Sequence, residues 1–431
     1  SSFTMKSTAS KLVLENLILK SEVQLTQKLI ESQELWLKNI EFRGLNTSSI
    51  LVSSKGSLKL KGVRFTGISS NENLLELGQE QDLQISELEI SDSTFLALIQ
   101  TEYSDVSLST VTVTNSSVKE LLLSIKEAKS TVSLSTIKLS FGNQKEDCSG
   151  LIQIEETPSS TVSINSLEIE GSPCEKQSNV RSPVLDIKYV GSVSITDSKF
   201  FSMNSSSDVG YALRAFSIES FSLSNVVFEN IQNRKDSITE FKTVDSLSLT
   251  NVKVTNCLGE LKGVFSANVV NLKIDNLECV SCGSNNGNGG ALYYLPYSSS
   301  KYETGLTIKD SVFRDAKSEL GGALFLDSGS KSLRIKLLIE DTQFYNSWAA
   351  RGAVIYIGEV VSFSSGILKG LSIWNSHSEI GAPINDYHRW GKLEVRNSSI
   401  SGSSGYYCGF YGEYTQSGEV LNISDSQFSN A

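Results

Sequence analysis

The chain has 431 residues, with 38 Lys or Arg against 48 Asp or Glu, which gives a formal net charge of −10 at pH 7. A chain this acidic repels a phosphate backbone, so the composition argues against a nucleic-acid partner. No apolar run reaches the roughly 18 residues of a membrane-spanning helix, and the sequence therefore predicts no membrane span. A few globular domains or one long repeat array fit these bounds.

A single apolar pattern recurs along the whole chain. In FSLSNVVFENI, which begins at Phe221, apolar residues occupy positions 0, 2, 5 and 7, counting the first residue as 0. We call this pattern the frame. It starts at Leu12, Leu35, Leu58, Leu83, Val106, Val132, Val162, Val193, Phe221, Leu247, Leu272, Leu306, Leu337, Leu371, Leu393 and Leu421. Alternation with a period of two predicts strands, and the adjacent polar residues at positions 3 and 4 predict a bend between them.

Two columns of the frame indicate how successive copies stack. Position 4 is Asn, Asp or Gly in twelve copies, namely Asn16, Asn39, Gly62, Asp197, Asn225, Asn251, Asn276, Asp310, Asp341, Asn375, Asn397 and Asp425. These residue types tolerate the left-handed αL conformation that a tight corner between two strands requires. Position 7 is Phe42, Phe65, Phe200, Phe228, Phe313, Phe344 or Phe428 in seven copies. Stacked copies are expected to bury these rings as a continuous aromatic ladder.

The two columns predict an all-β fold, a right-handed parallel β-helix (solenoid) of about sixteen coils, with residues 1–431 in a single domain. The chain enters its first frame at Leu12 and stops at Ala431 within a repeat. An uncapped coil leaves a strand edge open to pairing. We therefore expect this sequence to be part of a longer chain, or a copy that stacks with others into a fibre.

The stretch SNNGNGGALYYL (284–295) joins a loop rich in Gly and Asn to an apolar segment. A glycine-rich loop can hold phosphate, but Leu292 stands where the dinucleotide fingerprint needs a third glycine, and no Lys-Ser/Thr pair follows. The pattern recurs as ELGGALFLD (319–327) and ARGAVIYIG (350–358). The recurrence predicts a structural corner, at which glycine allows neighbouring coils to approach closely.

Two short signatures, written F-x-x-N and G-G-A-(L/I/V), resemble the repeats of the chlamydial polymorphic membrane proteins. The segments FENI (228–231), FYNS (344–347) and FSNA (428–431) carry the first, and GGAL at Gly289 and Gly321 carries the second. FRDA at Phe313 and RGAV at Arg351 are near matches. The resemblance implies a surface-exposed passenger with an adhesive or structural use, on the right-handed β-helix that pectate-lyase-like proteins share.

The cysteines indicate an oxidising compartment. Cys257 and Cys282 occupy position 10 of consecutive frames, and Cys148 and Cys174 occupy the corner regions of two consecutive coils. Because consecutive coils lie within disulfide range, we predict the pairs Cys257–Cys282 and Cys148–Cys174. Cys279 stands at position 7 and is expected to be a small buried core residue.

Sequons also indicate an extracellular compartment. Five N-x-(S/T) sequences predict N-glycosylation at Asn46, Asn115, Asn204, Asn397 and Asn422. Cys408 has no evident partner. The Cys279–Cys282 CxxC sequence lacks the second pair that a zinc site needs, so no metal and no cofactor is expected.

The segment NDYHRW (385–390) is the best local candidate for catalysis. Asp386, His388 and Arg389 could supply a base, an acid and a charge, and Trp390 could stack on a sugar ring. Pectate-lyase-like and polygalacturonase-like enzymes of the predicted fold use clustered Asp with Arg, Lys or His on one strand face. No paired carboxylates recur on adjacent coils here, so a solvated loop is the simpler interpretation. A second candidate patch, for sugar or for protein, is Tyr406, Tyr407, Phe410, Tyr411 and Tyr414.

These observations favour an extracellular structural or adhesive β-helix glycoprotein, a subunit of a surface coat or fibre. Its expected partners are other copies of itself, surface or matrix components, or carbohydrate. The alternative is a polysaccharide lyase or glycoside hydrolase of the pectate-lyase-like fold. A soluble carbohydrate-binding module is a third class, and fold alone does not decide among the three.

Overall fold

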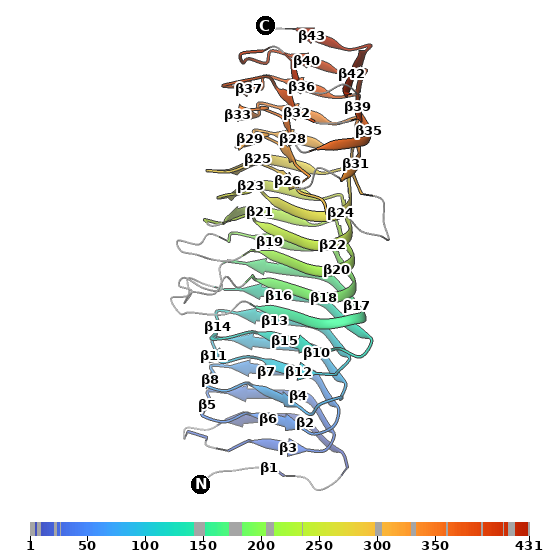
Figure 1. Cartoon of the computed structure of the whole chain (residues 1–431). Helices are drawn as coiled ribbons and strands as arrows, with labels where there is room; N and C mark the ends of the chain where they lie inside the picture. The colour runs from blue at the N-terminus through green and yellow to red at the C-terminus, as the bar shows by residue number, and fades with distance from the viewer. Residues whose placement is uncertain are drawn as a thin grey trace. The chain divides into compact units, whose positions relative to one another are not determined.

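The computed structural model describes residues 5–6, 10–20, 24–25, 27–141, 151–171, 183–203, 211–234, 236–297, 304–328, 333–358, 361–388, 391–407, 409–412 and 419–429. Over these ranges the chain is all-β, its strands pair in parallel (Figure 1), and no helix is long and apolar enough to cross a bilayer. The chain divides into two compact units, unit 1 (Ser1–Ala212) and unit 2 (Leu213–Ala431). Each unit is a parallel β-solenoid, as predicted. The right-handed winding of the coils and the single-domain organisation stay predictions.

The longest ladder of unit 1 contains the frame. Its strands are β2 (Leu12–Lys20), β4 (Leu35–Arg43), β7 (Leu58–Thr66), β10 (Leu83–Ser91), β13 (Val106–Thr114), β16 (Thr131–Ser140), β17 (Ile152–Glu170), β18 (Leu185–Thr196) and β19 (Lys199–Phe201). Each predicted frame start pairs with the next, from Leu12 with Leu35 to Val162 with Val193. The apolar columns therefore lie directly above one another and form the core.

Two sheets of shorter strands complete the coils of unit 1. One precedes the frame and contains β1 (Met5–Lys6), β3 (Ile30–Ser32), β6 (Val52–Ser54) and β9 (Leu75–Leu77). In the next coils the corresponding strands are β12 (Ile99–Glu102) and β15 (Leu123–Lys126), which pair with each other and, through β17, belong to the same sheet as the frame. The other follows the frame and contains β5 (Asn46–Thr47), β8 (Ser69–Ser70), β11 (Thr94–Phe95) and β14 (Ser117–Val118). Inward side chains of these strands, such as Val52, Leu75 and Ile99, are fully buried and close the core.

Unit 2 repeats the arrangement. The frame begins on β20 (Leu213–Ser224), β22 (Thr239–Thr250), β24 (Phe265–Asp275), β27 (Gly305–Lys309), β31 (Arg334–Glu340), β35 (Ser362–Lys369), β39 (Gly391–Arg396) and β42 (Glu419–Ser424). Beyond the corner it continues on β21 (Val227–Gln232), β23 (Lys253–Gly259), β25 (Glu278–Ser284), β28 (Val312–Arg314), β29 (Lys317–Leu320), β32 (Gln343–Tyr345), β33 (Trp348–Arg351), β36 (Ser372–Trp374), β37 (His377–Ser378), β40 (Ser399–Ser401) and β43 (Gln427–Ser429). A further ladder contains β26 (Leu292–Tyr294), β30 (Leu324–Leu326), β34 (Ile355–Ile357), β38 (Ile384–Asp386) and β41 (Phe410–Gly412).

One predicted frame start is wrong. Gly366 pairs with Leu337 on one side and with Leu393 on the other, so the frame of β35 starts at Gly366 and not at Leu371. The corner residue of this coil is then Gly370, with φ +64°. Asn375 stands five residues later, at position 9. Glycine at position 0 carries no apolar signal, which is why the sequence pattern was placed five residues too late.

Position 4 is αL in every frame, as the corner hypothesis requires, with φ between +47° and +64°. This includes Glu87, Thr110, Thr136 and Ser166, whose residue types did not predict it. Position 9 forms a second αL corner, which the apolar pattern of the sequence does not indicate. It contains Gly44, Gly67, Asp92, Asn115, Gly171, Ser202, Asn230, Asn256, Ser281, Asp315, Asn346, Asn375 and Gly402.

The position 7 phenylalanines do not form the predicted continuous ladder. Phe42 stacks on Phe65, with ring centroids 4.8 Å apart, and Phe313 stacks on Phe344 at 5.1 Å. Between these pairs the column also contains Phe200 and Phe228, but it is interrupted by aliphatic side chains or cysteine, namely Ile90, Val113, Leu139, Ile169, Val254 and Cys279. The correction has a simple cause: a ring needs a ring in the adjacent coil to stack, and only neighbouring copies provide one.

The Gly-Gly-Ala corners are structural, as predicted. Gly289, Gly321 and Gly352 are αL, with φ from +61° to +68°. At Gly290 an added Cβ would lie 2.1 Å from the carbonyl oxygen of Gly322, in the next coil. Only glycine fits at the second position of this corner, because any side chain there would clash with the backbone of the adjacent coil.

Candidate functional site

The predicted catalytic residues lie inside the solenoid. Asp386 and His388 are 0% and 1% exposed, and His388 Nδ1 is 2.8 Å from both carboxylate oxygens of Asp386. The imidazole packs against the Phe363 ring at a centroid distance of 5.1 Å. A polysaccharide that runs along the outer surface cannot reach this pair, which instead forms a buried polar contact. Arg389 and Trp390 lie outside the described residues.

The cysteine pairing differs from the prediction. Cys257 and Cys282 are register partners on β23 and β25, as expected from the frame. Cys282 is nevertheless bonded to Cys279, three residues earlier, with a Cα–Cα distance of 6.1 Å, and Cys257 is a buried free thiol. Burial raises the pKa of Cys257 to about 12. The predicted Cys257–Cys282 bond is therefore corrected to Cys279–Cys282, and Cys279 is not a simple core hydrophobe. Cys148, Cys174 and Cys408 lie outside the described residues.

Four predicted glycosylation sites can be placed. Asn46 begins β5, Asn115 occupies a position 9 corner, Asn397 a position 4 corner, and Asn422 lies within β42. All four side chains are exposed, so each has room for a glycan. Asn204 lies outside the described residues.

A lysine-rich groove, not anticipated from the sequence, lies on the outer face of the frame strands β2, β4, β7 and β10 in unit 1. We call it the lysine groove; its volume is about 400 Å³, and its lining includes Trp36, Lys38, Lys59, Lys61, Gln84 and Ser86. Lys11 Nζ and Lys59 Nζ lie over the Trp36 ring, 3.2 and 4.7 Å from its centroid. The sequence signal was the outward positions 1 and 3 of the second and third frames, which read Trp, Lys, Lys, Lys.

The charges of the groove are only partly neutralised. Lys38 pairs with Glu15 at 3.5 Å, which is a single exposed contact. Lys59 is held over Trp36 by a cation–π interaction, and Lys61 has no acidic partner within the described ranges. A groove with excess ammonium groups attracts anions, because clefts lined by one sign of charge concentrate the opposite sign.

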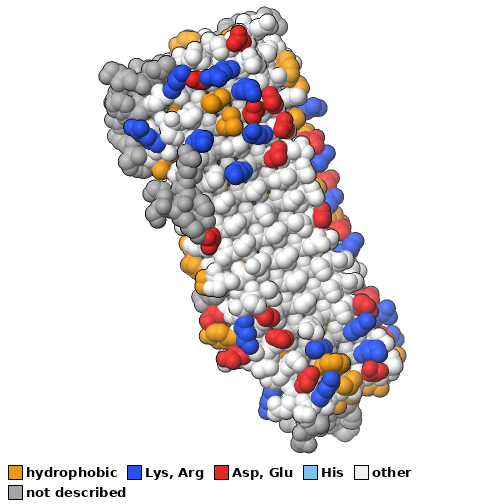
Figure 2. Space-filling view, turned by 90° about the vertical axis from the view of Figure 1, so that its right-hand side faces the viewer, with side chains coloured by type: hydrophobic (Ala, Val, Ile, Leu, Met, Phe, Trp, Pro, Cys, Tyr) orange, Lys and Arg blue, Asp and Glu red, His pale blue; other side chains and the backbone are white. Residues whose placement is uncertain are grey.

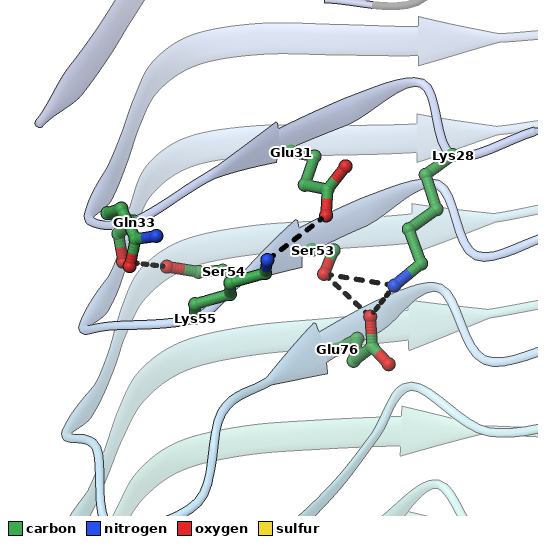
Figure 3. Close-up of polar contacts among 7 residues, drawn as sticks. All are labelled: Lys28, Glu31, Gln33, Ser53, Ser54, Lys55 and Glu76. Atoms are coloured by element: carbon green, nitrogen blue, oxygen red, sulfur yellow. Dashed lines mark hydrogen bonds and ion pairs between the residues drawn. The ribbon is translucent and has the colours of Figure 1, made fainter. Parts of the chain in front are cut away.

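A denser ionic network covers the sheet that precedes the frame in unit 1 (Figure 3). Glu76 accepts hydrogen bonds from Lys28 and from Ser53, the latter at 2.6 Å. Nearby, Lys55 lies 3.9 Å from Glu31. Burial acts to raise the pKa of Glu76, but the hydrogen bonds from Lys28 and Ser53 and the charge of Lys28 outweigh it and lower the pKa. This network is internally compensated and offers little net charge to a ligand.

Unit 2 has an exposed ionic ladder of its own. Glu340 lies 2.9 Å from Lys309 and 2.6 Å from Lys369, which are in the coils on either side. Hydrogen bonds from Lys369 and Lys309, with their charges, lower the pKa of Glu340 to about 2. Figure 2 shows the same arrangement more widely, with acidic and basic side chains next to one another. The lysine groove is distinguished from these surfaces by its unbalanced charge.

No family model and no curated protein matches the chain. The resemblance to the chlamydial polymorphic membrane proteins therefore stays a proposal, and one of its signatures needs correction. In FENI and FYNS the asparagine follows phenylalanine by two residues, not three, so the sequence is F-x-N. The structure explains the spacing: Phe228 is at position 7 and Asn230 at the position 9 corner, with φ +54°.

Proposed function

We propose that this protein is an extracellular structural or adhesive β-helix glycoprotein, and that the lysine groove binds an acidic polysaccharide. The observation that supports adhesion is the groove itself. Its ammonium groups suit carboxylate or sulfate groups spaced along a chain, and Gln84 and Ser86 can hydrogen-bond sugar hydroxyls. A polymer can follow the groove across several coils, since equivalent positions repeat from strand to strand.

The Cys279–Cys282 bond and the exposed sequons support the compartment. Disulfides persist in secreted and surface proteins and are rare where glutathione keeps thiols reduced. Mass spectrometry of native material should find N-linked sugar on at least two of Asn46, Asn115, Asn397 and Asn422. Native protein with no glycan and with all cysteines reduced would contradict an extracellular site of action.

Adhesion is tested by binding to an immobilised sulfated or uronic-acid polysaccharide. Reversing two charges in the Lys59→Glu/Lys61→Glu variant should weaken binding about tenfold or more, equivalent to at least about 1.4 kcal/mol. The matched control is Lys126→Glu/Lys129→Glu, which also reverses two exposed charges on unit 1, both outside the groove lining. Wild-type binding should also fall as salt rises, because screening shortens the reach of the lysine charges.

Loss of binding only in the Lys59→Glu/Lys61→Glu variant would support the lysine groove as the binding site. Equal loss in Lys126→Glu/Lys129→Glu would mean that net charge and not the groove binds the polymer. Equal binding to a neutral dextran would exclude acidic polysaccharide as the ligand class.

A further inference from the structure

Seven aromatic rings follow one another through unit 2 and end at its surface. We call them the tyrosine run: Tyr293, Phe325, Tyr356, Tyr387, Tyr411, Tyr407 and Tyr406. The strands β26, β30 and β34 place the first three in register. Centroids of successive rings are separated by 5.0, 5.4, 5.4, 5.7, 4.6 and 6.0 Å. The rings therefore form one series of contacts.

The run leads from buried rings to an exposed end. Phe325 and Tyr356 are 5% and 8% exposed, whereas Tyr407 is 46% and Tyr406 is 80% exposed. Tyr406 is the most exposed of the large hydrophobic side chains in the described ranges. A phenol ring in water forgoes the hydrophobic stabilisation of burial, so packing gives no reason for this placement.

We propose that Tyr406 is an oxidative cross-linking site that joins two copies of this chain through a dityrosine bond. The oxidant is hydrogen peroxide, used by a haem peroxidase. A phenol loses an electron readily when its proton can leave at the same time. Tyr406 can release that proton to water, which the buried members of the run cannot do. Because neighbouring rings are in contact, an electron removed from Tyr411 or Tyr407 is replaced from the exposed end, and the radical collects on Tyr406.

Two phenols each lose one electron and one proton, and one hydrogen peroxide accepts both pairs to give two waters. The two radicals form a carbon–carbon bond between the ring carbons next to the hydroxyl groups. The hydrogens on those carbons move to the oxygens and restore two phenols.

The partner for Tyr406 is a second copy of the chain. Tyr407 and Tyr411 are stacked at an interplanar angle of 26°, which keeps their reactive edges apart. Tyr406 projects furthest into solvent and can meet the same residue of another molecule. The cross-link would serve the structural role proposed above. Its test does not involve the lysine groove, so the two proposals can fail separately.

The test treats the purified full chain with a haem peroxidase and hydrogen peroxide. Dityrosine fluorescence should rise, and a covalent dimer should persist on a reducing denaturing gel, which removes disulfide-linked species. Tyr406→Phe should lose most of the dimer while keeping the ring and the fold. Tyr411→Phe should slow dimer formation, with the bond still at Tyr406.

Tyr189→Phe is the control, because Tyr189 is also an exposed tyrosine (46% against 80% for Tyr406) and lies in unit 1, outside the run. It should leave the dimer yield unchanged, and peptide mapping should place the bond at Tyr406. An equal loss of dimer in Tyr189→Phe, a bond mapped to Tyr103 or Tyr189, or no dimer in the wild-type chain would each overturn the proposal.

Discussion

The two units use the same frame with different residues at its corners and in its core. In unit 1 four consecutive position 4 corners are Glu87, Thr110, Thr136 and Ser166, whereas every position 4 corner of unit 2 is Asn, Asp or Gly. All of them are αL. The register is therefore set by the apolar columns, and the corner residue adjusts the stability of a bend that burial has already imposed.

The cores differ less than the corners. At position 7 unit 1 has the Phe42–Phe65 stack and Phe200 on either side of a run of aliphatic residues, Ile90, Val113, Leu139 and Ile169. At the same position unit 2 contains Phe228, the Cys279 sulfur and the Phe313–Phe344 stack. Both sets are buried. A solenoid accepts this variety because each coil has to match only its neighbours.

The largest expected loss of stability comes from replacing a buried side chain at position 7 with alanine. Phe228→Ala in unit 2 should cost about 3–5 kcal/mol, and Ile90→Ala at the same position in unit 1 about 2–5 kcal/mol, because each leaves a cavity. Hydrogen exchange should show the loss of protection concentrated around β20, β21, β22 and β23 for Phe228, and around β7, β10 and β13 for Ile90. Uniform loss of protection throughout a unit would contradict the nearest-neighbour description.

The second prediction concerns the cysteines of unit 2, which form the Cys279–Cys282 disulfide and leave Cys257 as a free thiol. Removing the disulfide with Cys279→Ala should cost about 2 kcal/mol, as expected for closing a loop this short. In the folded protein Cys257 should resist iodoacetamide, because it is buried and its pKa is raised to about 12. Non-reducing peptide mapping is the check. Recovery of Cys257 linked to Cys282 would restore the original prediction and contradict the observed pairing.

Most of the fold could be predicted because burial has a simple period. Apart from the coil of β35, frame starts such as Leu12, Leu35 and Leu83 are register partners along the ladders of each unit. The exception, Gly366, lacks a side chain and so carries no pattern. The second corner at position 9 lies beyond position 7, the last apolar position that defines the frame, so the apolar pattern gave no reason to look there, although its αL residues are nearly all Gly, Asn or Asp.

The candidate sites were much harder to predict. Asp386 and His388 looked catalytic by residue type, but alternation turns Asp386 inward, where it aligns with the buried Ile357. The choice between Cys257 and Cys279 as the partner of Cys282 depended on rotamers that no spacing specifies. The lysine groove, by contrast, follows from the outward positions and could have been found by reading the frame for its polar columns.

A third prediction concerns the corners. Asn251→Ala in unit 2 should lower the free energy of unfolding by about 1–2 kcal/mol, because alanine is strained in the αL conformation. It also loses amide hydrogen bonds to Asn225 at 3.1 Å and from Asn276 at 2.9 Å. Thr136→Asn in unit 1 should instead stabilise by about 1 kcal/mol, by replacing a β-branched residue at φ +53°. Urea unfolding measures both, and changes of the same sign would show that corner strain does not distinguish the units.

The smallest expected effects come from the ion pairs, and here the units differ in sensitivity to salt. The pKa of Glu340 is about 2 in the folded state, against an ordinary value of about 4.3 in the unfolded chain. The ionised carboxylate therefore stabilises the folded state fully when the pH is above the ordinary pKa, and this stabilisation is lost as the pH falls through the folded pKa. The stability gap between wild type and Glu340→Gln should therefore close between about pH 4.5 and pH 2.

Glu76→Gln in unit 1 should follow the same sign, because the pKa of Glu76 is also lowered. The difference in unfolding free energy between wild type and Glu76→Gln should stay within about 1 kcal/mol, since the ion pair of Glu76 with Lys28 is partly exposed. In 1 M salt the Glu340 gap should nearly vanish, because its lysines are exposed and the screening length is short. The Glu76 gap should persist in part, because Ser53 donates a neutral hydrogen bond at 2.6 Å that salt does not screen. Denaturant titrations at both salt concentrations decide the point: equal salt sensitivity would mean that Ser53 contributes nothing to holding the Glu76 carboxylate.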